Sequence, residues 1–287
     1  MFDSGSYMDD LLPLIQKQKT LLAKVQDSLK KISLPEENVA KRVNILRKEV
    51  ANIEKSIKDL RLDPVILQEI RNELEKARKE LTAKESEIKV KFGSDLAAAL
   101  MPHNFILEGH LPKLKISAYT IEVDFPADKV TLWFGTEIEK LDTTKAIPEK
   151  VVESLLKNHE VITRRPFDEK AFLQTLKTAY QMYLARNMRA AGTDAPLPEI
   201  HTFCSILMQK DKFRRNPVKE NLTEYTRAMF SYDLSRLKNR SVDQSELKLS
   251  TATRSETQVK GDYFWIPPFE GTPSGIYARM KFVGVTR

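Results

Sequence analysis

An apolar stripe between Glu36 and Leu60 constrains this chain more than any other feature. Its members are separated alternately by four and three residues, which is the a/d pattern of a coiled coil. The stripe consists of Val39, Val43, Leu46, Val50, Ile53, Ile57 and Leu60. Mostly polar and charged residues fill the positions between them, so only one narrow face of the helix is apolar. Such a helix requires partner helices, and we expect these seven residues to form a coiled-coil interface.

Two flanking stretches can supply the partner helices. Residues 8–33 carry a second heptad-like stripe, which Gln18 interrupts, and a third stripe follows Asp63-Pro64. This dipeptide predicts an N-cap followed by a proline in the first helical turn. Gly93 is the predicted end of the third helix. Similar lengths and short connectors favour an antiparallel helical coiled coil, made of all three helices or of the second and third alone.

The sequence pattern changes after residue 93. From Phe105 onward apolar and polar residues alternate, and they predict a β-hairpin over residues 114–135. Residues 148–287 form a helical and basic part that also contains strand-like runs at 247–253, 263–266 and 276–282. We therefore expect the α+β class with two domains. Residues 1–93 would be a helical coiled-coil module, and residues 94–287 a mixed α+β globular domain.

The order of elements between residues 168 and 266 is helix, helix, helix, strand, strand, which is the order of a winged helix. In this interpretation residues 199–209 and 218–238 form a helix-turn-helix pair, whose second helix enters the major groove. The loop around Arg254 and Lys260 would be the wing. The joint between the two helices is longer than the usual turn of three to four residues. Because other α+β domains share this order, the winged-helix-like C-terminal part is one of two alternatives.

The positive charge of the chain is concentrated near its C-terminus. The net charge is +7, and residues 205–260 contain 12 basic and 7 acidic residues, whereas residues 1–92 contain 19 and 16. A local basic excess favours contact with the phosphates of DNA or RNA, although many Lys and Arg residues only keep a surface solvated. The candidate nucleic-acid-binding residues are Lys210, Lys212, Arg214, Arg215, Lys219, Arg227, Arg236, Arg240, Arg254 and Lys260. The aromatic run 263–265 could stack on bases, or it could be a buried strand.

No residue pattern in the chain is typical of catalysis. The sequence has no Gly-x-Ser-x-Gly and no glycine-rich phosphate loop. His201 and Cys204 share a predicted helix face, but no further ligand has metal-site spacing. We therefore expect no catalytic residue, no metal and no cofactor. A small metal-dependent hydrolase or nuclease built on Asp124, Glu137 and Glu139 is the enzymatic alternative.

The single cysteine and the polar, acidic start predict a cytoplasmic protein, and no apolar run is long enough to span a membrane. We expect a non-enzymatic subunit of a larger assembly, in a homo- or hetero-oligomer. Its coiled coil would bind a protein partner, and its basic third would contact DNA or RNA. A prokaryotic genome-maintenance or phage-defence (antiviral) complex is one setting that fits. The alternative is a protein-only adaptor that homodimerises through the coiled coil.

Overall fold

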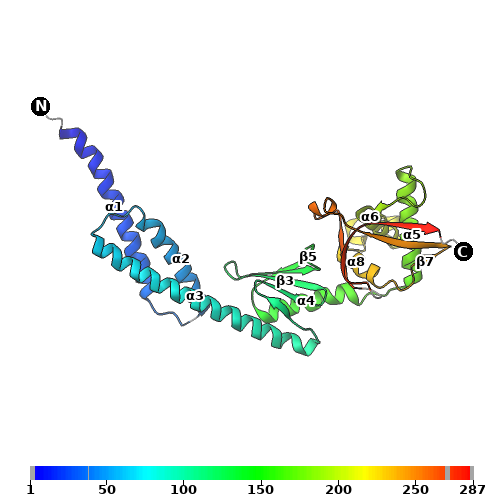
Figure 1. Cartoon of the computed structure of the whole chain (residues 1–287), viewed down its shortest axis with the longest axis horizontal. Coiled ribbons are helices and arrows are strands. Elements are labelled where there is room, and N and C mark those ends of the chain that lie inside the picture. The colour runs from blue at the N-terminus through cyan, green and yellow to red at the C-terminus, as the bar shows by residue number, and fades with distance from the viewer. Residues whose placement is uncertain (1–3, 38, 269–271, 285–287) are drawn as a thin grey trace. The chain divides into compact units, whose positions relative to one another are not determined.

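A computed structural model describes residues 4–37, 39–268 and 272–284 (Figure 1). The chain divides into two compact units, residues 1–95 and 96–287. The division falls close to residue 93, where we expected the helical module to end.

Three helices pack together in the N-terminal unit (Figure 1). They are α1 (Ser4–Ser33), α2 (Val39–Ile57) and α3 (Pro64–Leu100). The Gln18 side chain meets the chain just beyond α2, where its amide nitrogen donates to the carbonyl of Asp59 at 2.9 Å and its oxygen accepts from the amide of Arg61 at 2.7 Å. Further along α1, Ser28 donates to Glu49. Since the later residue of α1 pairs with the earlier residue of α2, these two helices are antiparallel.

The predicted apolar stripe is buried inside this three-helix region. Its buried members are Val43, Leu46, Val50, Ile53 and Leu60, and its half-buried members are Val39 and Ile57. Val25 of α1 and Ile70, Leu74 and Ala77 of α3 belong to the same core. The chain's own helices therefore cover the stripe, and its burial requires no second chain.

The predicted end of the third helix at Gly93 is wrong, because α3 continues to Leu100. Gly93 does not have the left-handed backbone of a helix-ending glycine. The residues after Asp95 are leucine and alanine, which are strong helix formers, and both Leu96 and Leu100 have no exposed surface. Burying a leucine stabilises by about 1.5–3 kcal/mol, which exceeds the cost of about 1 kcal/mol for a glycine within a helix.

After the end of α3, the second unit continues with a short 3-10 helix, η1 (Met101–His103), and a five-stranded antiparallel sheet. The strands are β1 (Glu108–His110), β2 (Lys113–Ile116), β3 (Tyr119–Asp124), β4 (Lys129–Phe134) and β5 (Glu139–Thr144), and they pair in chain order. β3 and β4 form the predicted hairpin, with Tyr119 opposite Phe134. The hairpin is confirmed, but the sheet around it was not predicted. Helix α4 (Pro148–Thr163) packs against β4 and β5.

The rest of the unit packs helices against a second antiparallel sheet. The helical elements are α5 (Glu169–Arg186), α6 (Leu197–Leu207), α7 (Asp211–Arg215), η2 (Lys219–Asn221), α8 (Arg227–Ser235) and η3 (Glu256–Gln258). The strands are β6 (Ala195–Pro196), β7 (Ser241–Val242), β8 (Ser245–Thr251), β9 (Phe264–Ile266) and β10 (Gly275–Gly284). They pair in the order β6-β10-β8-β7, and β9 pairs with the start of β10. The fold is therefore α+β, with a three-helix region, a five-stranded sheet and a mixed α/β part.

The helix predicted over residues 218–238 is wrong in its extent, because α8 spans only Arg227–Ser235. The 3-10 turn η2 and an irregular segment occupy the first part of the predicted range. The Thr226 hydroxyl accepts a hydrogen bond from the amide of Met229 at 3.3 Å. This N-cap satisfies a backbone group that has no partner within the helix, so the helix begins there.

Candidate nucleic-acid interface

The ten predicted nucleic-acid-binding residues lie in three different environments. Five lie between α6 and α8, namely Lys210, Lys212, Arg214, Arg215 and Lys219. Three lie on α8 or shortly after it, namely Arg227, Arg236 and Arg240. The last two, Arg254 and Lys260, belong to the β8–β9 loop, residues 252–263.

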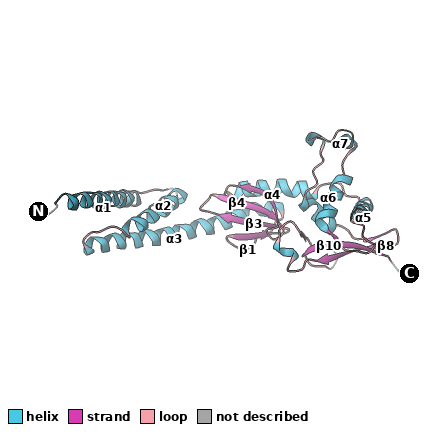
Figure 2. Ribbon diagram, turned by 90° about the horizontal axis from the view of Figure 1, so that it is seen from above, coloured by secondary structure: helices cyan, strands magenta, loops and turns pink. Residues whose placement is uncertain are grey.

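Residues 210–222 form a basic loop that leaves α6 and carries α7 away from the body of the unit (Figure 2). Its five cations are all exposed, and two acidic residues lower its net charge to +3. Arg214 folds back to donate to the carbonyl of Leu207 at 2.8 Å. Among the residues that the structure describes, the other four cations have no ion pair within the chain. Their charges are therefore available to an anionic partner.

A neck formed by Gln209 and Thr223 closes the basic loop. The buried Gln209 side chain donates to the carbonyl of Thr223 at 3.0 Å and accepts from the amide of Thr223 at 2.9 Å. It also donates to the carbonyl of Ser205 at 2.7 Å. No residue pattern in the sequence reveals the role of Gln209, because its hydrogen-bond partners are backbone groups. The neck positions the loop without using any of its charged side chains.

Aliphatic side chains are exposed beside the cations of the basic loop. Ile206 is 56% exposed, Val218 is 40% exposed and Leu222 is 51% exposed. Exposed aliphatic groups next to positive charge can also bind an acidic protein segment. The cations of the loop are thus suited to an anion, and the exposed aliphatic side chains of Ile206, Val218 and Leu222 can add apolar contacts.

Arg227, at the start of α8, is held by groups within the unit. Its guanidinium forms an ion pair with Glu139 of β5 at 2.5 Å and donates to the carbonyls of Gly261 and Tyr263. It also lies 3.8 Å from the ring centre of Phe264. Because these contacts occupy the guanidinium, the structure separates Arg227 from the exposed cations of the basic loop.

Arg236 belongs to an internal network around the buried carboxylate of Asp233. Asp233 accepts hydrogen bonds from Arg236, from Arg165 at 2.8 Å and from the hydroxyl of Tyr225 at 2.8 Å. The Arg236 guanidinium also lies over the ring of Phe167. A carboxylate that is removed from water needs such partners, so we assign Arg236 a structural role. Arg240 is half-buried.

The β8–β9 loop carries two exposed cations, Arg254 and Lys260. Lys260 donates to the carbonyl of Glu137 at 3.1 Å and lies over the ring of Trp133. The aromatic residues that follow are buried, since Tyr263, Phe264 and Trp265 are each less than a tenth exposed. The alternative that these rings stack on bases is therefore wrong, and the prediction of a buried strand is confirmed for Phe264 and Trp265.

The acidic residues considered for a metal-dependent enzyme have other partners. Asp124 accepts a hydrogen bond from the amide of Ala127 in the β3–β4 turn. Glu137 pairs with Lys113 at 2.6 Å, and Glu139 pairs with Arg227. Within the described ranges, no three His, Cys, Asp or Glu side chains are arranged to hold a metal ion.

His201 and Cys204 lie on α6 and face the interior of the unit. The Nε2 atom of His201 is 2.9 Å from the carbonyl of Tyr225, and burial lowers the pKa of this imidazole. Cys204 has no exposed surface, and burial raises the pKa of its thiol. A neutral histidine and a protonated thiol are typical of a packed core.

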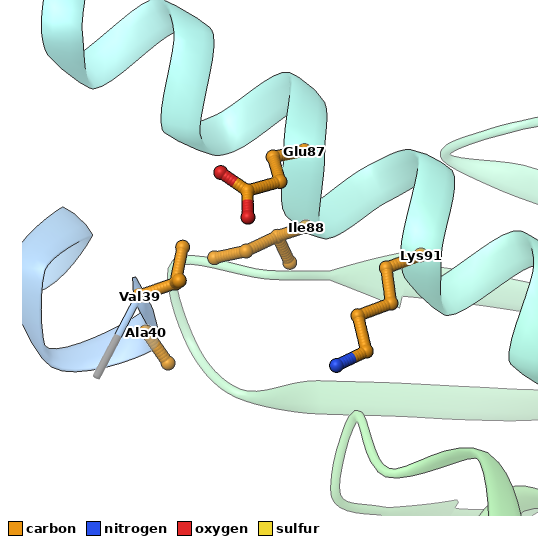
Figure 3. A pocket seen from close by; sticks show the side chains of 5 residues that line it. All are labelled: Val39, Ala40, Glu87, Ile88 and Lys91. Atoms are coloured by element: carbon orange, nitrogen blue, oxygen red, sulfur yellow. The ribbon is translucent and has the colours of Figure 1, made fainter. Parts of the chain in front are cut away.

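A shallow pocket of about 290 Å³ lies between α2 and α3 in the N-terminal unit (Figure 3). The side chains of Val39, Ala40 and Ile88 give it an apolar floor, and Glu87 and Lys91 border it.

The chain shows no significant match to a protein-family model, to a curated protein or to a solved structure. Over the described residues, no helix has both the length and the apolar character that crossing a bilayer requires. The function is therefore inferred from the geometry of the site alone.

Proposed function

We propose that this chain is a binding subunit that contacts nucleic acid through its basic loop and docks a protein partner through its three-helix region. The observation that carries the proposal is the group of five exposed cations on the basic loop, four of which have no ion pair among the described residues. The neck at Gln209 and Thr223 supports it, because it presents these charges on an anchored loop.

Charge favours a phosphate backbone as the ligand. Double-stranded DNA carries one negative charge for about every 1.7 Å of its axis, and each phosphate that a protein neutralises releases condensed counterions. Five cations on thirteen residues match this charge density better than the three-helix region does, where basic and acidic residues nearly balance. If all five contact phosphates, the slope of log K against log salt is about −4.5.

We infer a winged-helix-like arrangement for the C-terminal part, with an enlarged turn. Support comes from helices α5, α6 and α8, which precede strands β8 and β9 in the chain, with β6, α7 and β7 between them; β8 and β9 each pair with β10 and not with each other. Residues 208–226 separate α6 from α8, whereas a helix-turn-helix uses a turn of about three to four residues. The cations lie on this enlarged turn, so it is the turn that we assign to the nucleic acid.

Neutralisation of the basic loop tests the nucleic-acid half of the proposal. The test variant changes Lys210, Lys212, Arg214, Arg215 and Lys219 to Gln. The control removes five positive charges from exposed lysines elsewhere in the same unit, at Lys115, Lys129, Lys145, Lys157 and Lys170. Fluorescence anisotropy with a labelled duplex measures Kd at several salt concentrations. We expect the test variant to lose more than about tenfold in affinity and most of its salt slope, while the control loses less than about threefold.

Two results would contradict this assignment. If the wild-type chain does not bind duplex even at low salt, the nucleic-acid half of the proposal is wrong. If both variants lose affinity equally, net charge and not the basic loop determines binding. The exposed Ile206, Val218 and Leu222 favour a second candidate, an acidic protein segment, and this candidate gains support if duplex binding is absent.

The outer faces of the three-helix region are proposed as the docking surface for the protein partner. Leu12, Leu14 and Ile15 are exposed on α1, ahead of the point where Gln18 meets the residues after α2. Of these three residues, Leu14 keeps the four-and-three spacing to Gln18 and Leu21, so the apolar stripe of α1 continues beyond the buried core. Changing Leu14 and Ile15 to Lys should remove a co-purifying partner, whereas changing the exposed Lys24 and Lys30 to Gln should not. Light scattering of the purified chain separates this proposal from the homodimeric adaptor, which requires twice the monomer mass.

A further inference from the structure

The helix that reads bases in a helix-turn-helix is inaccessible in this chain. A recognition helix contacts base edges with residues near its N-terminus. α8 occupies that position in the order of elements, but its side chains face the interior. The buried residues of α8 are Ala228, Met229, Phe230, Ser231, Asp233 and Leu234. α4 and β9 pack against this helix, and the one arginine in its first turn, Arg227, is held by Glu139 and two backbone carbonyls.

The aromatic run next to Lys260 is also inaccessible to bases. Proteins that bind single-stranded nucleic acid use aromatic side chains as platforms for stacked bases. Tyr263, Phe264 and Trp265 lie next to the exposed cation Lys260, but all three are buried. The aromatic residue of the basic loop, Phe213, is half-buried. The accessible part of the proposed site therefore consists mainly of cations and aliphatic groups.

We propose that this chain binds the sugar-phosphate backbone of double-stranded nucleic acid through the basic loop and does not read base sequence. This inference rests on the proposed function and names its ligand class. α7 has five residues, and at 1.5 Å per residue it is about 7.5 Å long, which is short for a helix that fills a major groove. Lys212 and Arg215 have no ion pair among the described residues. No ion pair therefore holds either side chain in the fixed orientation that a contact with one base edge needs. Unrestrained cations on an exposed turn suit phosphates, which are the same at every base pair.

Binding of the full-length chain to ligands of different base content tests this inference. The probes are three labelled duplexes of equal length with A·T pairs only, G·C pairs only or a mixed sequence, and the single strand of the mixed duplex. We expect the three duplexes to have Kd values within about twofold of one another, and the single strand to bind several-fold more weakly. Inorganic polyphosphate, which has no bases, should displace each duplex completely.

A variant of α8 gives an independent readout. Arg227→Lys keeps the charge but cannot keep the planar guanidinium contacts that read a guanine. We expect the folded variant to retain the Kd of the wild-type chain within about twofold, whereas loss of a base-reading arginine costs about tenfold or more at one sequence. A variant with a lowered melting temperature is compared at a temperature where circular dichroism shows it to be folded.

The outcomes separate the inference from the function on which it rests. A preference of about tenfold for one duplex over the others, or tighter binding of the single strand, would overturn the inference and leave the proposed function intact. Failure of all three duplexes to bind at low salt would overturn the proposed function and the inference with it.

Discussion

The Nε atom of Arg227 on α8 lies 2.5 Å from the Oε1 atom of Glu139 on β5. The two residues are 88 positions apart in the chain, and their side chains are only 24% and 17% exposed. This ion pair joins the five-stranded sheet to α8, which we predicted as the second helix of a helix-turn-helix pair. The ion pair explains why Arg227, which the sequence predicts as a nucleic-acid contact, has a structural role.

Removing this ion pair should destabilise the second unit. Arg227→Ala leaves Glu139 without its partner in a half-buried site, and we expect the free energy of unfolding to fall by about 3 kcal/mol. Trp133 and Trp265, the two tryptophans of the chain, both lie in this unit, so their fluorescence during urea denaturation measures the loss. The exposed Arg254→Ala is the matched control and should cost less than about 0.5 kcal/mol. Equal stability of Arg227→Ala and the wild type would show that the pair contributes nothing.

The neck at Gln209 should control how tightly the basic loop is held. Gln209→Ala removes three hydrogen bonds and leaves backbone groups of Thr223 without their partner, at a cost of about 1–3 kcal/mol. Trypsin cleaves after Lys and Arg, so the five cations of the loop report its opening. We expect faster cleavage between residues 210 and 219 in this variant than in the exposed control Gln174→Ala. Unchanged cleavage would show that the loop is held by other contacts.

The buried carboxylate of Glu49 should make the three-helix region sensitive to acid. Burial raises the pKa of Glu49, but hydrogen bonds from Ser28 and Asn52, together with Lys31, outweigh burial and hold it below its ordinary value of 4.5. The unfolded chain therefore takes up this proton first. The stability that the interaction provides is present above the unfolded pKa and is lost as the pH falls through the lower folded pKa.

The melting temperatures of Glu49→Gln and of the control Glu69→Gln, each compared with the wild type, measure this effect. Between pH 6 and about pH 3 the melting temperature of Glu49→Gln should fall less than that of the wild type, because the variant has no proton to gain at this site. The exposed Glu69→Gln is the control and should follow the wild type. Identical pH dependence of all three proteins would show that Glu49 is not linked to folding.

Two measurements on the three-helix region test the burial of Ile53 and whether the apolar stripe is closed within one chain. Ile53 has no exposed surface, and Ile53→Ala should cost about 2–5 kcal/mol of stability in the three-helix region. If the stripe is closed within the chain, the melting temperature does not change over a roughly hundredfold range of protein concentration. A melting temperature that rises with concentration would instead support homodimerisation through the stripe.

The thiol of Cys204 should react only when the second unit unfolds. Burial raises the pKa of this thiol and removes it from solvent, so the thiolate that reacts with alkylating reagents is scarce at neutral pH. We expect iodoacetamide to label Cys204 in urea but not in buffer, as intact-mass measurement would show. Rapid labelling of the folded protein would indicate that α6 opens under native conditions.

Local patterns of the sequence predicted much of the fold correctly. The a/d spacing of Leu46 and Ile53 predicted the buried face of α2, and the alternation from Tyr119 to Phe134 predicted the β3–β4 hairpin. Asp63 was predicted as the N-cap of the third helix, and its carboxylate accepts a hydrogen bond from the amide of Val65 at the start of α3. These features depend on the period of a helix or a strand and on groups within a few residues, so the sequence is sufficient to predict them.

Only the tertiary structure decided which charged residues are available. The sequence suggested ten candidate cations in the C-terminal third. It could not distinguish Lys212 and Arg215, which are exposed and have no ion pair among the described residues, from Arg227, whose partner Glu139 is distant in the chain. It also could not show that chain-internal helices cover the stripe of α2. Burial and ion pairing depend on contacts between segments far apart in sequence, and periodicity within one segment carries no information about them.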